Sequence, residues 1–273
     1  MILPEKISTF KNEVNAFFMQ HGRSFPWREN ITPWGVVVSE FMLQQTQTER
    51  VVPFFKRWME RWSTPADLAG ASLEDTLREW IGLGYNRRCR FLKECARIIC
   101  AKHEGKVPET PAELAQLPGI GAYTAGAIVC FAYNYPSIFI ETNIRTAFLH
   151  FFFKDEASVT DKKLIPLLEK ALDHENPRQW YWALMDYGAA LKKSGENPSR
   201  RSAHYTKQSA FDGSFRQLRG KVVRSLAMDG KANTEELVLR TGITPDDLYR
   251  TLSALNHDSI VAEQEGIYQI QER

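Results

Sequence analysis

Apolar residues recur every three or four positions along most of the first 205 residues. This spacing places them on one face of a helix, and alternating strand patterns are nearly absent, so we predict an all-α domain. Thr110, Pro111 and Glu113 have the spacing of a capped helix start. The predicted helices lie in "ADLAGASLEDTLREWIGLG", "YNRRCRFLKECARIICAKHEG", "TPAELAQLPGIG", "AYTAGAIVCFAYN", "TNIRTAFLHFFF", "DKKLIPLLEKALDHEN" and "PRQWYWALMDYGAALKKSG".

Residues 214–273 show a different pattern, in which three short helical segments precede one alternating segment. "IVAEQEGIYQIQ" alternates around Glu265–Gly266, as two strands of a hairpin do. We therefore predict a small winged-helix-like domain, which could bind DNA or a partner protein. The expected helix ends are marked by caps, a proline and glycines at Gly230, Asn233, Glu236, Gly242, Thr244 and Pro245.

The segment between these parts is polar and basic. Residues 196–213 contain few large aliphatic side chains and read as a basic linker that follows a main domain of residues 1–195. From Lys192 to Arg224 there are nine basic residues against two acidic ones. A second basic cluster, which includes Arg88, lies in residues 87–102. Such runs are often solvated faces, but both are candidate DNA-binding surfaces.

Composition places few other limits on the function. Apolar residues make up 43% of the 273 residues and charged residues 25%, which is ordinary for a soluble globular protein. We find neither a membrane-spanning run nor a signal-peptide pattern, and expect a cytoplasmic monomer of bacterial or archaeal origin that is associated with the nucleoid. The four cysteines form no C-x-x-C pair, which argues against a zinc or cluster site.

"LPGIGAYTAGAI" is the segment most indicative of a ligand. Gly119 and Gly121 allow a tight turn with exposed amides, and the following helix directs its N-terminus toward the same point. A helix-hairpin-helix that binds a DNA phosphate through Leu117 to Gly121 fits this pattern, although a plain helix turn is the alternative.

Three segments carry a family resemblance: "FPWRENITPWGVVVSEFMLQQTQTERVVPFF", "WIGLGYNRRCRFL" and "LPGIGAYTAGAI". They resemble the adenine-DNA glycosylase branch of the helix-hairpin-helix base-excision (HhH-GPD) superfamily, which also contains endonuclease III. The resemblance runs from about Phe25 to Ala190. It implies a DNA glycosylase of base-excision repair, whose partner is double-stranded DNA with a lesion or mismatch and which flips the target nucleotide out of the helix.

The resemblance also implies two catalytic carboxyl groups. Glu40, in "SEFMLQQTQ", matches the family's proton donor to adenine, and its apolar neighbours favour a raised pKa. Glu141, in "IETNIR", stands where the family has aspartate, and Asn143 matches its supporting asparagine. Glutamate keeps the charge on a longer arm, so either the pocket is rebuilt around it or activity is lost. Asp186, in "ALMDYGA", matches a further acidic position.

Other positions refine this expectation. Tyr123 stands where endonuclease III-like lyases carry a nucleophilic lysine, so we expect a monofunctional enzyme that uses water. Gln45 and Tyr85 resemble residues that insert into the base stack, although a core tyrosine is the alternative for Tyr85. In the basic clusters, the expected DNA contacts are Arg88, Arg200, Arg201 and Lys207.

The chain departs from the family in two ways. The segment after "MDYGA" lacks the four cysteines of the family's iron–sulfur cluster, so we expect no cofactor except a possible monovalent cation on the hairpin carbonyls. The family's C-terminal domain, which recognises 8-oxoguanine, is replaced by residues 214–273. Adenine or another purine is the expected released base. A mismatch thymine or uracil glycosylase, and an inactive DNA-structure binder, remain alternatives.

Overall fold

A computed structural model describes residues 4–195, 197–206 and 210–272. The described residues are mostly helical, as the apolar spacing predicted, and none of their helices is long and apolar enough to cross a membrane. The chain divides into two compact units that alternate along the sequence. Unit 1 contains Met1–Pro33, Glu109–Ala115 and Ile120–Lys207, and unit 2 contains Trp34–Pro108, Gln116–Gly119 and Gln208–Arg273.

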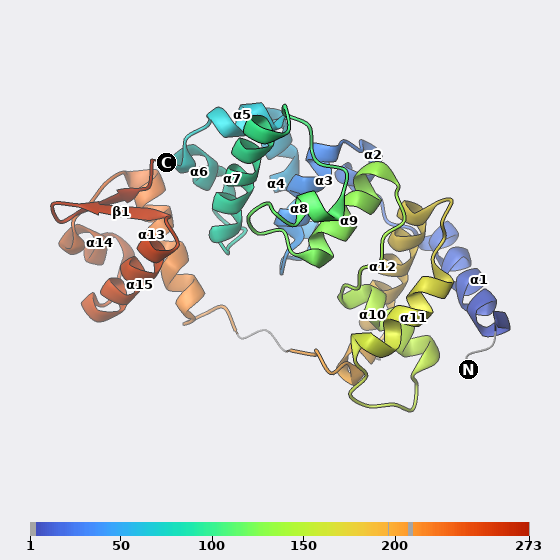
Figure 1. The fold of residues 1–273 in the computed structure, drawn as a ribbon. Coiled ribbons are helices and arrows are strands. Elements are labelled where there is room, and N and C mark those ends of the chain that lie inside the picture. Colours follow the sequence, from blue (N-terminus) through green and yellow to red (C-terminus); the bar gives the residue numbers. More distant parts are fainter. Residues whose placement is uncertain (1–3, 196, 207–209, 273) are drawn as a thin grey trace. The chain divides into compact units, whose positions relative to one another are not determined.

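Unit 1 is built around α10 and α12, which pack against each other, with α1 also against α12 (Figure 1). Phe10 of α1 lies at the centre of its core, with its ring 4.9 Å from Phe148 and 6.0 Å from Trp180. The helices of this unit are α1 (Pro4–His21), α2 (Pro26–Glu29), α8 (Pro111–Leu114), α9 (Ala122–Tyr133), α10 (Thr142–Phe152), α11 (Asp161–Ala171), α12 (Pro177–Lys193) and the 3₁₀ turn η1 (Pro198–Arg201).

Unit 2 has a tryptophan core in which Trp58 packs edge-on against Trp62 and Trp80. Its C-terminal part packs on the rest through α13, which contacts α6. The elements of this unit are α3 (Pro33–Leu43, which begins at the unit boundary), α4 (Thr48–Arg61), α5 (Pro65–Gly70), α6 (Leu73–Trp80), α7 (Arg87–Lys102), α13 (Phe215–Asp229), α14 (Thr234–Thr241), α15 (Pro245–His257), β1 (Val261–Gln264) and β2 (Ile267–Ile270).

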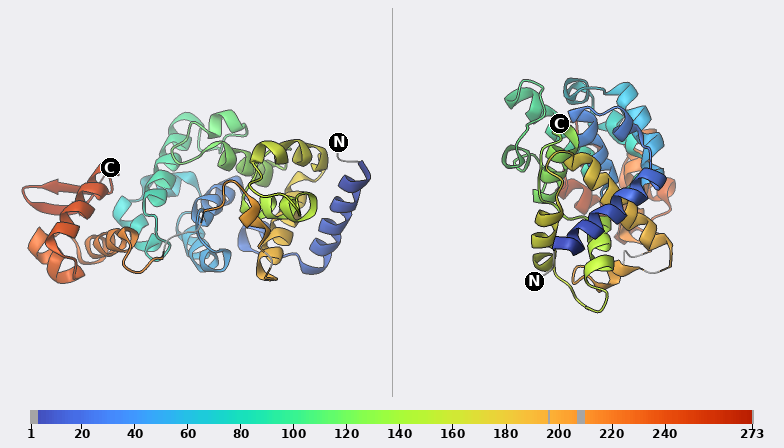
Figure 2. Two further views of the ribbon diagram at one scale, coloured as in Figure 1. Left: turned by 90° about the horizontal axis from the view of Figure 1, so that it is seen from below. Right: turned by 90° about the vertical axis from the view of Figure 1, so that its right-hand side faces the viewer.

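The C-terminal elements follow the sequence prediction closely. Asn233 and Glu236 form a reciprocal capping box at the start of α14, and Gly242 ends that helix with a left-handed φ of 65°. Strands β1 and β2 pair in antiparallel orientation (red in Figure 2). Glu265 and Gly266 both have positive φ, as a tight two-residue hairpin turn requires. These elements are confirmed, while the winged-helix assignment itself stays a prediction.

One predicted helix is two helices in the structure. The apolar stripe of "ADLAGASLEDTLREWIGLG" continues through residues 66–80, but α5 ends at Gly70 and α6 begins at Leu73. Ser72 caps the second helix by accepting a hydrogen bond from the amide of Asp75. A serine with an acidic residue three positions later is a helix-start signal, and it outweighs the continuity of the apolar stripe here.

Candidate active site and DNA-binding residues

Glu141 lies at the N-terminus of α10 and caps it. Its Oε1 accepts hydrogen bonds from the backbone amides of Asn143 at 2.5 Å and Ile144 at 2.8 Å. The side-chain amide of Asn143 donates to the other oxygen, Oε2, at 3.3 Å. A carboxylate is favoured here because the first amides of a helix lack intrahelical partners and carry partial positive charge. Glutamate can therefore hold a fixed negative charge at the position where the family has aspartate.

The environment of Glu141 acts on its pKa in two opposing directions. Burial of the carboxyl group raises the pKa, and this is the largest effect. The amides of Ile144 and Asn143 and the charges of Lys192 and Arg145 lower it, but the net shift is upward. The residue as a whole remains partly exposed. Glu141 thus combines a buried carboxyl group with a residue that is partly exposed as a whole.

Close packing between α10 and α12 fixes the backbone beside Glu141. A Cβ atom on Gly188 would lie 2.0 Å from the carbonyl oxygen of Asn143, so only glycine fits at this crossing. Within the described residues, the side-chain oxygen Oδ1 of Asn143 is buried without a hydrogen-bond partner. A buried acceptor of this kind is costly in a protein interior and often belongs to a functional site.

Asp186, on α12, forms a buried ion-pair cluster in unit 1. Its carboxylate accepts hydrogen bonds from the guanidinium groups of Arg23 and Arg28 at 2.7–3.0 Å and from the backbone amide of Arg23 at 2.8 Å. The Asp186 side chain is 1% exposed and that of Arg28 is 7% exposed. With its oxygens occupied by these donors, Asp186 is better suited to positioning the residue 23–28 segment than to proton transfer.

The remaining predicted catalytic residues lie in different units. Tyr123 is half-buried in the first turn of α9 in unit 1, with its ring edge-on to Phe139 at 5.8 Å. Its phenol contains no amine that could form a Schiff base. Glu40 belongs to unit 2, where it is 8% exposed in the middle of α3.

Both predicted stack-inserting residues have a strained backbone. Gln45 has a φ of 54° and Tyr85 a φ of 50°, which are left-handed conformations that side-chain-bearing residues seldom adopt. Each follows a helix of unit 2 by a few residues, Gln45 after α3 and Tyr85 after α6. Such strain persists only where the surroundings enforce it, and it gathers at functional sites.

Arg88 helps to hold the strained backbone near Gln45 and Tyr85 in place. Sequence analysis predicted a DNA contact, but the residue is 7% exposed and its guanidinium is turned inward. It donates hydrogen bonds to the carbonyls of Phe41 and Met42 at 2.9 Å and of Gly84 at 3.1 Å. Burial lowers its pKa to about 10, so it remains charged at neutral pH. Arg88 therefore ties the C-terminal end of α3 to the loop that carries Tyr85.

The glycine-rich turn has the geometry that a helix-hairpin-helix needs. Gly119 has a φ of 79°, and a Cβ atom there would lie 2.7 Å from the ring of Phe91. Gly121 is exposed and caps α9 without a side-chain hydrogen bond, which leaves the first amides of a twelve-residue helix open to a ligand. Leu117 has a buried side chain, so only its backbone could contact DNA.

The predicted basic linker is partly packed on unit 1. Arg200 is exposed, whereas Arg201 donates from its guanidinium to the carbonyl of Leu149 at 3.4 Å. The amide of Val159 donates to the carbonyl of Arg201 at 2.8 Å. Lys207 lies outside the described residues. Contact of Arg200, Arg201 and Lys207 with DNA stays a prediction.

The four cysteines are free, and the absence of an iron–sulfur cluster stays a prediction. Cys89, Cys95 and Cys130 are buried, and burial raises the pKa of the Cys89 thiol to about 12. Residues 191–210 contain no cysteine. In the described part of the chain, no three His, Cys, Asp or Glu side chains gather where they could hold a metal ion.

Comparison with known proteins identifies the family. Residues 38–173, which include α9, Glu141 and Asn143, match the family model described as HhH-GPD superfamily base excision DNA repair protein. The chain belongs to the HhH-GPD superfamily. The match includes both helices of the hairpin and ends before α12.

Among curated relatives, the HhH-GPD chain is similar to adenine DNA glycosylases. That of Mycobacterium tuberculosis (strain ATCC 25618 / H37Rv) is 43% identical over 150 residues, which are 53% of this chain and 49% of the relative. The Homo sapiens protein is 33% identical over 198 residues, which are 68% of this chain and 36% of the relative. The chain thus matches about half, or less, of the length of these relatives.

Solved structures share the fold. A thermostable thymine-DNA glycosylase superposes with a TM-score of 0.61 at 23% identity, over 68% of this chain and 87% of that one. Endonuclease III in a non-covalent DNA complex gives a TM-score of 0.55 at 22% identity, over 70% of this chain and 86% of the other.

Several residues of this HhH-GPD chain escaped the sequence analysis. Arg23 and Arg28 were not predicted to bind Asp186, because ion partners more than 150 positions apart leave no local pattern. Gly188 gave a usable signal, since a glycine inside an amphipathic helix often marks a close approach. Lys192 was counted only as part of a basic run, although its charge acts on Glu141.

Proposed function

We propose that this protein is a monofunctional DNA glycosylase of base-excision repair that releases adenine from double-stranded DNA. The observation that carries the proposal is the capped, buried carboxyl group of Glu141 beside Asn143. Cleavage of the base–sugar bond develops positive charge at the anomeric carbon, and a pre-organised anion stabilises that charge. The similarity to adenine DNA glycosylases supports adenine as the leaving base.

The proposed roles divide between the two carboxyl groups. Glu40 protonates the adenine ring and so makes it a better leaving group. Glu141, as carboxylate, stabilises the cationic sugar, and Asn143 holds that carboxylate through its side-chain amide. Water then completes the hydrolysis. Because Tyr123 has replaced the lyase lysine, the enzyme leaves an abasic site and an unbroken strand.

A second candidate, release of mismatched thymine, follows from Tyr123 and from the shared fold of the thermostable thymine-DNA glycosylase. The two candidates differ in the base that is released. In the adenine reaction, Glu40 is essential as an acid. Replacing it with glutamine should abolish adenine release because an amide cannot protonate the ring.

A panel of duplexes tests these alternatives. Each duplex carries one defined mismatch or damaged base, including adenine opposite guanine or 8-oxoguanine and thymine opposite guanine. Products are separated with and without alkali under single-turnover conditions. Strand breaks at the adenine position that appear only after alkali treatment support the proposal. Breaks at thymine establish the second candidate, and tight binding without any release would identify a DNA-structure binder.

A further inference from the structure

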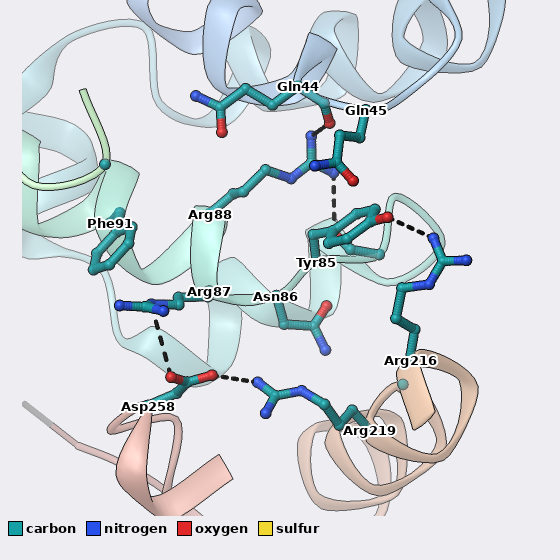
Figure 3. Close-up of a pocket in the computed structure, with 13 residues that line it drawn as sticks. Gln44, Gln45, Tyr85, Asn86, Arg87, Arg88, Phe91, Arg216, Arg219 and Asp258 are labelled. Atoms are coloured by element: carbon teal, nitrogen blue, oxygen red, sulfur yellow. Dashed lines mark hydrogen bonds and ion pairs between the residues drawn. The ribbon is translucent and has the colours of Figure 1, made fainter. Parts of the chain in front are cut away.

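A cavity of about 400 Å³ lies in unit 2 between the start of α7 and the start of α13 (Figure 3). Its volume is within the range of ligand pockets. One wall contains Gln45, Tyr85 and Arg88, and the other contains Arg216 and Arg219 of the C-terminal segment. The residues with strained backbone thus share one cavity with a helix outside the superfamily match of residues 38–173.

Arg216 contacts Tyr85 in two ways. Its guanidinium donates a hydrogen bond to the phenolic oxygen of Tyr85, and its central carbon lies 5.3 Å from the centre of the Tyr85 ring (Figure 3). Arg88 approaches the same ring at 5.4 Å. Guanidinium groups attract the electron-rich face of an aromatic ring, so these contacts together fix the orientation of a side chain on a strained backbone.

Helix α13 is itself held in place. Arg219 forms an ion pair with Asp258 at 2.6 Å, and Arg87 of α7 approaches the other oxygen of that carboxylate at 3.7 Å. Arg78 of α6 donates from Nε to the carbonyl of Ala227 at 2.5 Å. Arg216 therefore extends from a helix that is anchored to the rest of unit 2 near both ends.

We propose that Arg216 is a positioning residue for Tyr85, so that insertion of this tyrosine into the DNA stack depends on the C-terminal segment, residues 210–272. The inference rests on the proposed function, because only a protein that opens the duplex needs an inserting side chain. A ring that is already oriented loses less conformational freedom on binding, and pre-organisation of this kind raises affinity. The C-terminal segment then contributes to catalysis without touching the target base.

A double-mutant cycle tests the coupling. Arg216→Met removes the hydrogen bond and the cation, and Tyr85→Ala removes the side chain that they orient. Binding is measured on mismatched duplexes with 2-aminopurine beside the mismatch, whose fluorescence rises when the stack opens. Arg216→Met should weaken binding by roughly 3- to 10-fold and reduce the fluorescence rise, as expected for the loss of one hydrogen bond of ordinary strength. In the Tyr85→Ala protein, Arg216→Met should change the affinity and the fluorescence rise by less than about 2-fold.

Arg224→Met is the matched control, since it removes the same charge from an exposed position of α13. Any loss of affinity that Arg224→Met causes should be equal in the parent and in the Tyr85→Ala protein. Arg216→Lys gives a second cycle if Arg216→Met does not fold, because lysine keeps the charge without the planar group. Equal effects of the Arg216 change with and without Tyr85 would overturn the inference. If the Arg216 and Tyr85 substitutions are coupled in stack opening but no duplex loses a base, the glycosylase activity is contradicted and the role of Arg216 is not.

Discussion

Gly188 of α12 lies against the backbone carbonyl of Asn143 in α10, at a distance that leaves no room for a Cβ atom. This contact sets the separation of the two helices at the residue that supports Glu141. The position of the carboxylate therefore depends on a glycine that is 47 residues away in the sequence.

Gly188→Ala should displace α10 and slow base release. Alanine is intrinsically better than glycine in a helix by about 1 kcal/mol, but overpacking costs about 1–3 kcal/mol, so we expect a net loss of stability. A shift of about 1 Å in the carboxylate should lower the single-turnover rate by about 100-fold. Gly70→Ala, which meets only open space, is the control and should leave the rate unchanged. A Gly188→Ala enzyme with the parent's rate would refute this role.

Lys192→Met should shift the pH dependence of base release. Glu141 must be charged to act, so the rate falls as pH decreases through its pKa, which burial already raises. The charge of Lys192 lowers that pKa, and its removal raises it further. The acid limb of the pH–rate profile should therefore move to higher pH, with a several-fold lower rate on that limb. Lys193→Met, at an exposed neighbouring position, should leave the limb in place. Identical profiles for the two variants would contradict the coupling.

Asp186→Asn should destabilise the protein strongly. It removes the counter-charge of Arg28, whose own pKa is lowered by burial, and uncompensated buried charges cost about 3–5 kcal/mol. Denaturant unfolding measures this loss. Glu94→Gln breaks an exposed pair with Arg97 and should cost less than about 1 kcal/mol. If Asp186→Asn is as stable as Glu94→Gln, the cluster does not anchor the residue 23–28 segment.

Purified protein should be colourless and contain no stoichiometric iron. Cys89, Cys95 and Cys130 are buried, and residues 191–210 contain no cysteine. Metal analysis and the visible absorption spectrum check this expectation. An absorption shoulder with matching iron content would show that a cluster is bound after all.

The sequence predicted local features better than distant ones. The caps at Asn233 and Gly242 and the turn at Glu265–Gly266 are confirmed, because each depends on residues within one helical turn or hairpin. The break between α5 and α6 was missed because the apolar stripe continued across it. Arg88 was assigned to DNA because a sequence shows the charge of a long side chain and not its direction. The role of Gly188 depends on how two helices cross.

The most direct test of the central claim is the single-turnover rate of base release by Glu141→Gln on the duplex that the parent cleaves best. Glutamine can still accept the amide hydrogen bonds that cap α10, so the fold and DNA affinity should persist. Loss of the negative charge should reduce the rate by about 1,000-fold. Glu175→Gln, at an exposed position of the same unit, should behave as the parent. Release by Glu141→Gln at the parent's rate would show that another residue stabilises the cationic sugar.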